Sequence, residues 1–184
     1  MVSGVSVLNS PETAKKRGAT APGIEDEQMI TVFWAGFWTF LADQASKYIV
    51  VHMLNLRLRG ELDILPPFLN LRMAWNYGVN FGLFSQSSNL VRWGLIALAL
   101  IICMAVLWWV GRDRPGRIGL VSAGLLIGGA LGNVVDRLLY GAVADFINMS
   151  CCGISNPYAF NVADIAIFIG AFGLVLWGGT KKAA

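Results

Sequence analysis

The chain has 184 residues, of which 56% are hydrophobic and 14% are charged, and its formal net charge is +3. Soluble domains contain about 25% charged residues, so this composition is typical of a membrane protein, and the scattered basic residues exclude an extended nucleic-acid-binding surface. A single histidine, together with three cysteines that lack metal-ligand spacing, favours neither a metal site nor a Ser-His or Cys-His catalytic machinery.

Residues 1–28 are polar and contain the basic cluster Lys15–Arg17 and the acidic run Glu25–Glu27. This pattern predicts a disordered cytoplasmic tail. The first apolar run begins late and no clear small-residue cleavage site accompanies it, which argues against a secretory signal peptide. We expect residues 29–180 to form one transmembrane domain.

Four apolar segments follow the tail, over residues 29–53, 90–110, 118–139 and 162–178. Each is close to the roughly 20 residues that cross a bilayer as a helix. Helices are expected because the backbone must satisfy its own hydrogen bonds in lipid. The predicted fold is therefore a membrane protein of the all-α class, built as a bundle of four transmembrane helices.

The orientation of the bundle follows from lysines and arginines beside the spans, because cytoplasmic connections are enriched in them. With four spans, one side of the membrane receives the basic residues of both chain ends and of the short connection between the second and third spans. That connection carries Arg112, Arg114 and Arg117. The arginines of the other side are mostly spread through a long connection, where they count for less. We predict that both termini are cytoplasmic.

The two outer connections differ in their predicted structure. In the first, Pro66 and Pro67 precede the mixed aromatic and aliphatic segment 68–77, which predicts a short strand in a small sheet on the outer surface. Gly78 and Gly82 are expected to form bends. The second connection, residues 141–161, is predicted as a loop. Its adjacent cysteines at 151–152 could bridge only with strain, so we interpret them as incidental.

Polar side chains inside apolar spans are costly and by default mark function or internal pairing. At about 1.5 Å of rise per residue, Asp43 lies roughly 21 Å and Asn133 roughly 22 Å from the inner face. This level is near the outer edge of a core about 30 Å thick. The other polar residues at or just beyond it are Lys47, Asp136, Arg137, Asn161, Asp164 and Asp145. Because they come from three spans and converge at one depth, we expect a functional site there.

Two acidic residues have basic neighbours in the sequence. Asp43 and Lys47 are spaced i, i+4 and can form an ion pair on one helical face. This spacing is equally compatible with a self-neutralising structural pair and with a substrate-facing pair. Asp136 and Arg137 are adjacent and point in different directions, which favours a structural role at the helix end. The third span also carries a stripe of small residues, Gly124, Gly128, Gly129 and Gly132. We interpret this stripe as a close helix-packing face.

Asp145 and Asp164 have no obvious basic neighbour in the sequence. Two carboxylates in a partly desolvated site cannot both ionise easily, so one pKa rises and the pair holds one proton between a base and an acid. Such a pair can activate water on an amide carbonyl and protonate the leaving nitrogen. The spacing alone is also compatible with helix caps, since Asp164 is near a helix N-terminus.

Five motifs occur in order, namely Asp43-Gln44-x-x-Lys47, Asn76 to Gly82, Gly129 to Arg137, Gly141 to Phe146 and Phe160 to Asp164. Over roughly residues 30–180 the chain resembles lipoprotein signal peptidase (signal peptidase II), a family of aspartyl proteases of the bacterial inner membrane. The resemblance implies an enzyme that removes the signal peptide from a prolipoprotein by cleaving before its diacylglyceryl-modified cysteine.

The resemblance also implies residue roles, with Asp145 and Asp164 as the catalytic aspartates. Substrate-binding or site-bracing roles fall on Asp43, Lys47, Asn76, Gly78, Asn133, Asp136, Arg137, Asn161 and Ala163. The implied fold has four helices, a small periplasmic β-cradle and a short periplasmic helix, with the active site near the periplasmic face and no metal or cofactor. The expected partners are diacylglyceryl-modified prolipoproteins and membrane lipids, with no nucleic acid, and the protein is expected to be a monomer.

The chain departs from the family pattern at Asn80, at Ala142, in the loop with the adjacent cysteines and in the N-terminal extension. These departures are expected to affect the edge of the substrate-binding region more than the two aspartates. The rival interpretations are a proton-relaying transporter or channel and a non-catalytic membrane scaffold. A transporter favours ionisable groups near the bilayer middle and inverted repeats, and neither feature is visible. A scaffold gives no reason for uncompensated acids at one depth.

Overall fold

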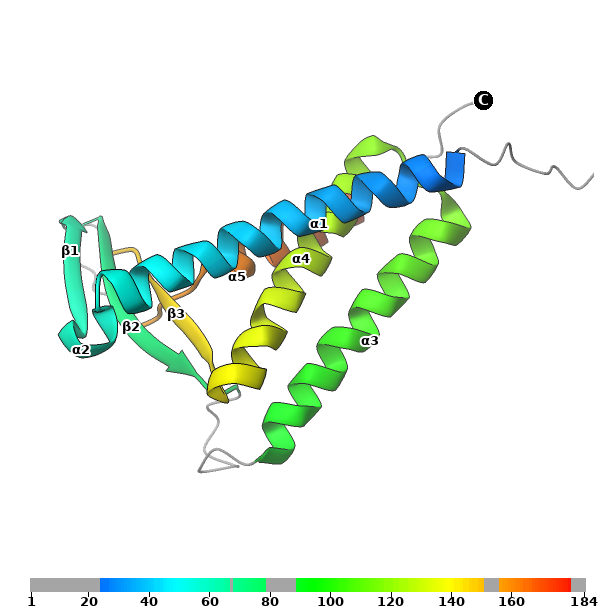
Figure 1. Cartoon of the computed structure of the whole chain (residues 1–184). Helices are drawn as coiled ribbons and strands as arrows, with labels where there is room; N and C mark the ends of the chain where they lie inside the picture. The colour runs from blue at the N-terminus through cyan, green and yellow to red at the C-terminus, as the bar shows by residue number, and fades with distance from the viewer. Residues whose placement is uncertain (1–23, 67, 79–88, 151–155, 180–184) are drawn as a thin grey trace, which may run out of the picture.

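The computed structural model describes residues 24–66, 68–78, 89–150 and 156–179 (Figure 1). The predictions for residues 1–23, for Asn80 and Gly82 and for the cysteines at 151–152 lie outside these ranges. Four long helices dominate the described chain, and their bounds are α1 Ile24–Tyr48, α3 Asn89–Asp113, α4 Arg117–Tyr140 and α5 Val162–Trp177. They match the four predicted apolar segments, except that α1 begins five residues before Met29 and continues beyond Tyr48 as the π-helix η1, Ile49–Met53.

Helix α4 is the central helix of the bundle, and the small residues of its sequence allow this position. A Cβ atom added at Gly128 would meet the backbone of Gly36 in α1, and one added at Gly129 would lie 2.6 Å from the carbonyl oxygen of Ala163 in α5. The glycines therefore let two neighbouring backbones approach α4 closely, as small-residue interfaces do in membrane bundles. The predicted role of the glycine stripe in helix packing is confirmed.

The third side of α4 packs against α3 through larger apolar side chains. Ala123, Ile127 and Ala130 of α4 form one buried cluster with Cys103 and Val110 of α3. Within the described ranges, α3 and α4 are the helices long and apolar enough to cross a membrane, and α5 is a shorter apolar helix of 16 residues. Large apolar side chains on α3 and α5 also remain exposed in the isolated chain. The protein is thus mostly helical, with the apolar character of a membrane protein.

One end of the bundle carries a small antiparallel sheet in the order β1-β2-β3 (Figure 1). Its strands are β1 Glu61–Leu65, β2 Leu69–Asn76 and β3 Val143–Asn148. Strand β2 confirms the strand predicted in the first connection. Strand β3 corrects the prediction of the second connection as a loop, because residues 143–148 pair with β2 in a register that places Asp145 opposite Ala74.

A second buried cluster joins this sheet to the helices. Val50 of η1, Leu56 and Phe146 are its buried members, and Leu56 belongs to the one-turn helix α2, Leu56–Arg59. Backbone hydrogen bonds between Ile147 and Phe160 tie β3 to the segment that enters α5. The sheet therefore holds both β3, which follows α4, and the segment that precedes α5 at the same end of the bundle.

Candidate active site

Asp145 lies in the middle of β3 and is only 4% exposed. Its two carboxylate oxygens accept hydrogen bonds from different elements. The side-chain amide of Asn76, at the end of β2, donates to Oδ2 over 3.0 Å, and the side-chain amide of Asn161 donates to Oδ1 over 2.6 Å. The pairing of β2 with β3 thus brings Asn76 to Asp145 across 69 residues of sequence.

Asp164 lies in the first turn of α5, where it takes part in a capping box with the N-cap residue Asn161. The Asn161 side chain accepts a hydrogen bond from the backbone N–H of Asp164 over 2.9 Å, and Oδ2 of Asp164 accepts one from the backbone N–H of Asn161 over 3.2 Å. Its other oxygen, Oδ1, accepts a hydrogen bond from the side-chain amide of Asn133 over 2.9 Å. Asp164 is therefore a cap, as one interpretation of its spacing predicts, and it also faces α4.

Asn161 links the two aspartates. It is fully buried, and its side-chain amide donates both to Asp145 and, over 3.3 Å, to Oδ1 of Asn133. Asn161 thus donates a hydrogen bond to Asp145, Asn133 donates one to Asp164, and the two asparagines are hydrogen-bonded to each other. Hydrogen-bonded buried side chains hold their rotamers, so this network fixes the relative orientation of the two carboxylates.

The environment of Asp145 favours its protonated form. Burial, and after it the nearby negative charge of Asp164, raise the pKa of its carboxyl to about 6. The hydrogen bonds from Asn76 and Asn161 and the positive charge of Lys47 act in the opposite direction. A carboxyl with a pKa in this range can give or take a proton near neutral pH.

A buried charge cluster lies directly behind the aspartates. The Lys47 ammonium is 2.8 Å from a carboxylate oxygen of Asp43 and 2.8 Å from one of Asp136, and both carboxylates are almost completely buried. Asp43 and Lys47 thus form the i, i+4 ion pair that their spacing predicts. Lys47 also donates a hydrogen bond to Asn133 over 3.2 Å, which connects the cluster to the Asp164 partner.

Both carboxylates of this cluster hold the backbone next to a candidate catalytic residue. Oδ1 of Asp43 accepts a hydrogen bond from the backbone N–H of Ala163 over 3.0 Å, one residue before Asp164. Oδ2 of Asp136 accepts one from the backbone N–H of Ala144 over 3.1 Å, one residue before Asp145. The cluster therefore positions both aspartates through their backbones.

Gln44 is a member of this cluster that sequence reasoning quoted in a motif but left out of the predicted site. Its side-chain amide nitrogen lies 3.1 Å from Oδ2 of Asp43, 3.1 Å from Oδ1 of Asp136 and 3.3 Å from the carbonyl oxygen of Gly132. A polar side chain next to Asp43 in an apolar span was the available signal. A Cβ added at Gly132 would meet the Asp43 carboxylate, so this glycine gives the cluster its space.

The remaining predicted residues lie at the edge of the site. Arg137 donates a hydrogen bond to the backbone carbonyl of Asn133 over 3.3 Å, and its positive charge acts on both Asp145 and Asp164. The backbone N–H of Gly78 donates to Oδ1 of Asn76 over 3.0 Å. Gly78 has a φ of +109°, and a Cβ there would lie 2.7 Å from the Leu95 side chain, so both conformation and space favour glycine.

The arrangement can carry out acid–base chemistry on a substrate at the sheet end of the bundle. Two carboxyl groups with different environments are linked by hydrogen bonds through Asn133 and Asn161, and Asp145 has a raised pKa. Such a pair supplies one base and one acid. Within the described ranges, no group of three or more His, Cys, Asp or Glu side chains is arranged to hold a metal ion.

Comparison with solved structures places this architecture among membrane enzymes. Two structures, both described as a bacterial membrane enzyme studied by the in meso method, have related folds. One, at 2.3 Å resolution, has a TM-score of 0.67 and 27% identity, and the match covers 85% of this chain and 95% of that one. The other, at 1.9 Å resolution, has a TM-score of 0.69 and 28% identity, covering 80% and 92%. The fold and the polar site at its sheet end thus define a bacterial membrane enzyme.

Sequence comparison gives the family. Residues 36–178 match the family model of signal peptidase (SPase) II. A lipoprotein signal peptidase of Methylobacterium sp. (strain 4-46) is 41% identical over 138 residues, which cover 75% of this chain and 82% of the relative. One of Alteromonas mediterranea is 36% identical over 151 residues, which cover 82% and 81%. The chain belongs to the signal peptidase II family.

Proposed function

We propose that this chain removes signal peptides from prolipoproteins by cleaving before the diacylglyceryl-modified cysteine, and that it does so as an aspartic endopeptidase. The observation that carries the proposal is the pairing of Asp145 and Asp164 through Asn161 and Asn133. Family membership supports the reaction, since the curated relatives are named lipoprotein signal peptidases. The buried carboxyl of Asp145 beside the half-buried carboxyl of Asp164 supports the aspartic mechanism.

In the proposed mechanism, a water molecule between the two carboxyl groups attacks the scissile carbonyl. Ionised Asp164 takes a proton from this water, while protonated Asp145 donates a hydrogen bond to the carbonyl oxygen. Asp145 then gives its proton to the leaving amine. The proton that Asp164 took from water passes to Asp145, so the pair again holds one proton, on Asp145. The amide of Asn161 stabilises the negative charge that Asp145 acquires, because it already donates to the carboxylate.

The same proposal covers the placement in the membrane. The four long helices span the bacterial inner membrane, and both termini lie in the cytoplasm. The end of the bundle opposite the sheet carries Arg112, Arg114 and Arg117 between α3 and α4, which supports a cytoplasmic position for that end. The sheet and the aspartates then lie at the periplasmic face, where the modified cysteine of a substrate emerges. We further propose that the protein acts as a monomer in contact with membrane lipids.

A reconstituted cleavage assay tests the function. The purified protein in proteoliposomes should shorten a precursor that carries the diacylglyceryl thioether, and mass spectrometry should place the new N-terminus at the modified cysteine. The matched control is the same precursor without the lipid, which should remain uncut. Equal cleavage of both precursors, or cleavage at another bond, would contradict the proposal.

The pH dependence of cleavage tests the assignment of the acid. Because Asp145 must be protonated and its pKa is about 6, kcat/KM should fall as the pH rises above about 6. The hydrogen bond from Asn76 lowers this pKa, so Asn76→Ala should raise it and move the alkaline limb to higher pH. The profile is measured with the lipidated precursor in proteoliposomes. A kcat/KM that increases through pH 6 to a plateau would instead make Asp145 the base.

A further inference from the structure

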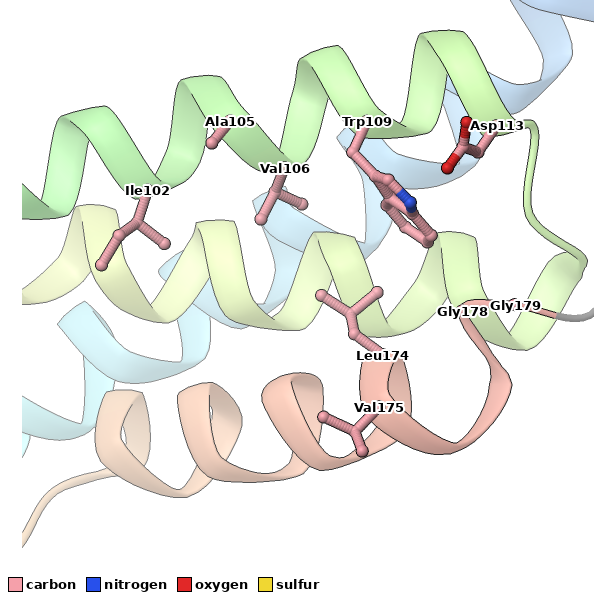
Figure 2. Close-up of a pocket in the computed structure, with 9 residues that line it drawn as sticks. All are labelled: Ile102, Ala105, Val106, Trp109, Asp113, Leu174, Val175, Gly178 and Gly179. Carbon is pink, nitrogen blue, oxygen red and sulfur yellow. The ribbon is translucent and has the colours of Figure 1, made fainter.

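Three apolar grooves of the described chain run along the helices, and they differ in the charge that lines them. The groove between α3 and α5 includes the Asp113 carboxylate (Figure 2). The groove between α1 and α3 is lined by uncharged side chains alone. The groove between α4 and α5 includes Arg117, its one charged side chain among the described residues. Of the three grooves, the one between α4 and α5 therefore favours an anionic ligand.

Arg117 lies at one end of the groove between α4 and α5. It is the first residue of α4, and Trp177, the last residue of α5, also lines the groove. A Cβ added at Gly119 would lie 3.6 Å from the carbonyl oxygen of Trp177, so these two helix ends are adjacent. They lie at the end of the bundle opposite the sheet (Figure 1). From there, the apolar walls formed by Val121 and Phe172 continue toward the middle of the bundle.

The length of the groove fits the acyl chain of a lipid rather than a membrane-spanning helix. The lining extends over eight residues from Arg117 to Leu125 and over eight from Ile169 to Trp177. Eight residues of helix are about 12 Å long. Half of a bilayer core about 30 Å thick is longer than this, so the groove remains within one leaflet. Its volume is about 470 Å³.

The guanidinium of Arg117 is available to a ligand. Arg117 is exposed, and among the described residues its side chain forms no ion pair or hydrogen bond. By contrast, Nε of Arg112 lies 3.7 Å from the carboxylate of Asp113. Asp26 and Glu27 of α1 are acidic and lie at the same end of the bundle, but neither lines the groove. Arg117 is thus the charge that a ligand in this groove meets.

The surroundings of Arg117 are those of a lipid headgroup. From Arg112 to Arg117 the chain contains three arginines and one aspartate, which is a net positive charge. Basic pockets between membrane helices are typical binding sites for the headgroups of acidic lipids. Trp177 is 41% exposed at the same end of the groove. Tryptophan is enriched at the level of the headgroups, so both side chains indicate where the membrane surface lies.

We propose that the groove between α4 and α5 binds an anionic phospholipid, with one acyl chain against Val121 and Phe172 and the phosphate on Arg117. The planar guanidinium can donate two hydrogen bonds to two phosphate oxygens. This site lies at the opposite end of the bundle from the two aspartates, so it goes beyond the proposed cleavage reaction. With the proposed orientation, the lipid belongs to the cytoplasmic leaflet.

Native mass spectrometry of the full chain tests the headgroup preference without a cleavage assay. The protein is released from micelles that contain equal amounts of phosphatidylglycerol and phosphatidylcholine with the same acyl chains. The native protein should retain more phosphatidylglycerol. Arg117→Gln should lower the ratio of the two bound lipids by about fivefold, the effect of one arginine near an anionic membrane surface. Arg117→Lys should retain most of the preference, because it keeps the charge.

Arg59→Gln is the matched control, because it removes one exposed arginine from α2, at the sheet end of the bundle. It should leave the lipid ratio unchanged. Equal retention of the two lipids by the native protein overturns the proposal. An unchanged ratio in Arg117→Gln, or a loss of the same size in Arg59→Gln, also overturns it. Inactivity of the native protein in the cleavage assay would contradict the proposed function without affecting this result.

Val121→Trp tests the groove itself. Val121 is 38% exposed and lines the groove, so a larger side chain there should fill the space of the acyl chain and reduce bound phosphatidylglycerol. Ile101→Trp is the control, because Ile101 is exposed on α3 and lines none of the three grooves. Equal binding by the two variants overturns the groove as the site. Displacement of the lipid by inorganic phosphate at constant ionic strength overturns the phospholipid as its ligand.

Discussion

Asp145→Asn and Asp164→Asn should each lower kcat for cleavage of a lipidated precursor by roughly 10²- to 10⁴-fold, the range of a lost general acid or base. The substitutions change little in shape. An asparagine at either position keeps one acceptor oxygen but replaces the other with an amide group, which then meets a hydrogen-bond donor. At position 145 that donor is the side chain of Asn76 or Asn161. At position 164 it is the side chain of Asn133 or the backbone N–H of Asn161. For Asp164→Asn, removing the negative charge of a half-buried carboxylate offsets part of that loss. Both variants should therefore fold, as measured by thermal unfolding in detergent.

The double variant provides the sharper measurement. Two residues that act as one unit lose activity together, so Asp145→Asn with Asp164→Asn should be no slower than the slower single variant. Independent effects would instead multiply. Asp63→Asn is the matched control, because Asp63 is an exposed aspartate of the same sheet and should keep full activity. Native activity in either single catalytic variant would remove that aspartate from the mechanism.

The helices of this chain are predictable from sequence because lipid permits few alternatives. The segments expected at 90–110 and 118–139 are α3, Asn89–Asp113, and α4, Arg117–Tyr140. The backbone of a long apolar segment must form its own hydrogen bonds in a bilayer, so its length and composition nearly determine its structure. The convergence of polar residues from three helices at one end of the bundle was predictable for the same reason, since helical rise converts residue number into position along each helix.

Strand β3 was not predictable in this way, because its residues lack the alternation that identifies a half-buried strand. Five of its six residues are buried, and they cover both faces of the sheet. Its structure is set by pairing with β2, which is distant in sequence. The contact of Asn76 with Asp145 depends on that pairing. The resemblance to signal peptidases grouped these two residues in one site, and the register supplies the physical link.

The sequence pattern also could not predict that Asn161 both caps α5 and bonds to the site residues Asp145 and Asn133. Its position before α5 predicts a helix cap, and the capping box is present. However, its amide nitrogen also bonds to Asp145 and Asn133, which belong to a strand and to another helix. A side chain with several hydrogen-bonding groups can serve several partners, and only the tertiary structure selects them.

Lys47→Met should destabilise the folded protein by about 3–5 kcal/mol, the usual cost of leaving buried charges without their partner. The variant removes the only ammonium that lies within 2.8 Å of both Asp43 and Asp136 among the described residues, and these carboxylates are 0% and 1% exposed. Because each carboxylate also holds the backbone beside one of the two proposed catalytic aspartates, cleavage should weaken together with stability. Denaturant titration in detergent micelles measures the stability.

Neutralising the whole cluster separates charge from packing. Lys47→Met combined with Asp43→Asn and Asp136→Asn removes every charge of the ion-pair cluster, and replacing a complete buried ion cluster is often neutral or stabilising. The triple variant should therefore be more stable than Lys47→Met alone, although it carries more substitutions. Arg112→Met is the control, since its exposed pair with Asp113 should change stability by less than about 1 kcal/mol. If the triple variant is less stable than Lys47→Met, the aspartates contribute through their hydrogen bonds to Ala163 and Ala144 rather than through their pairing with Lys47.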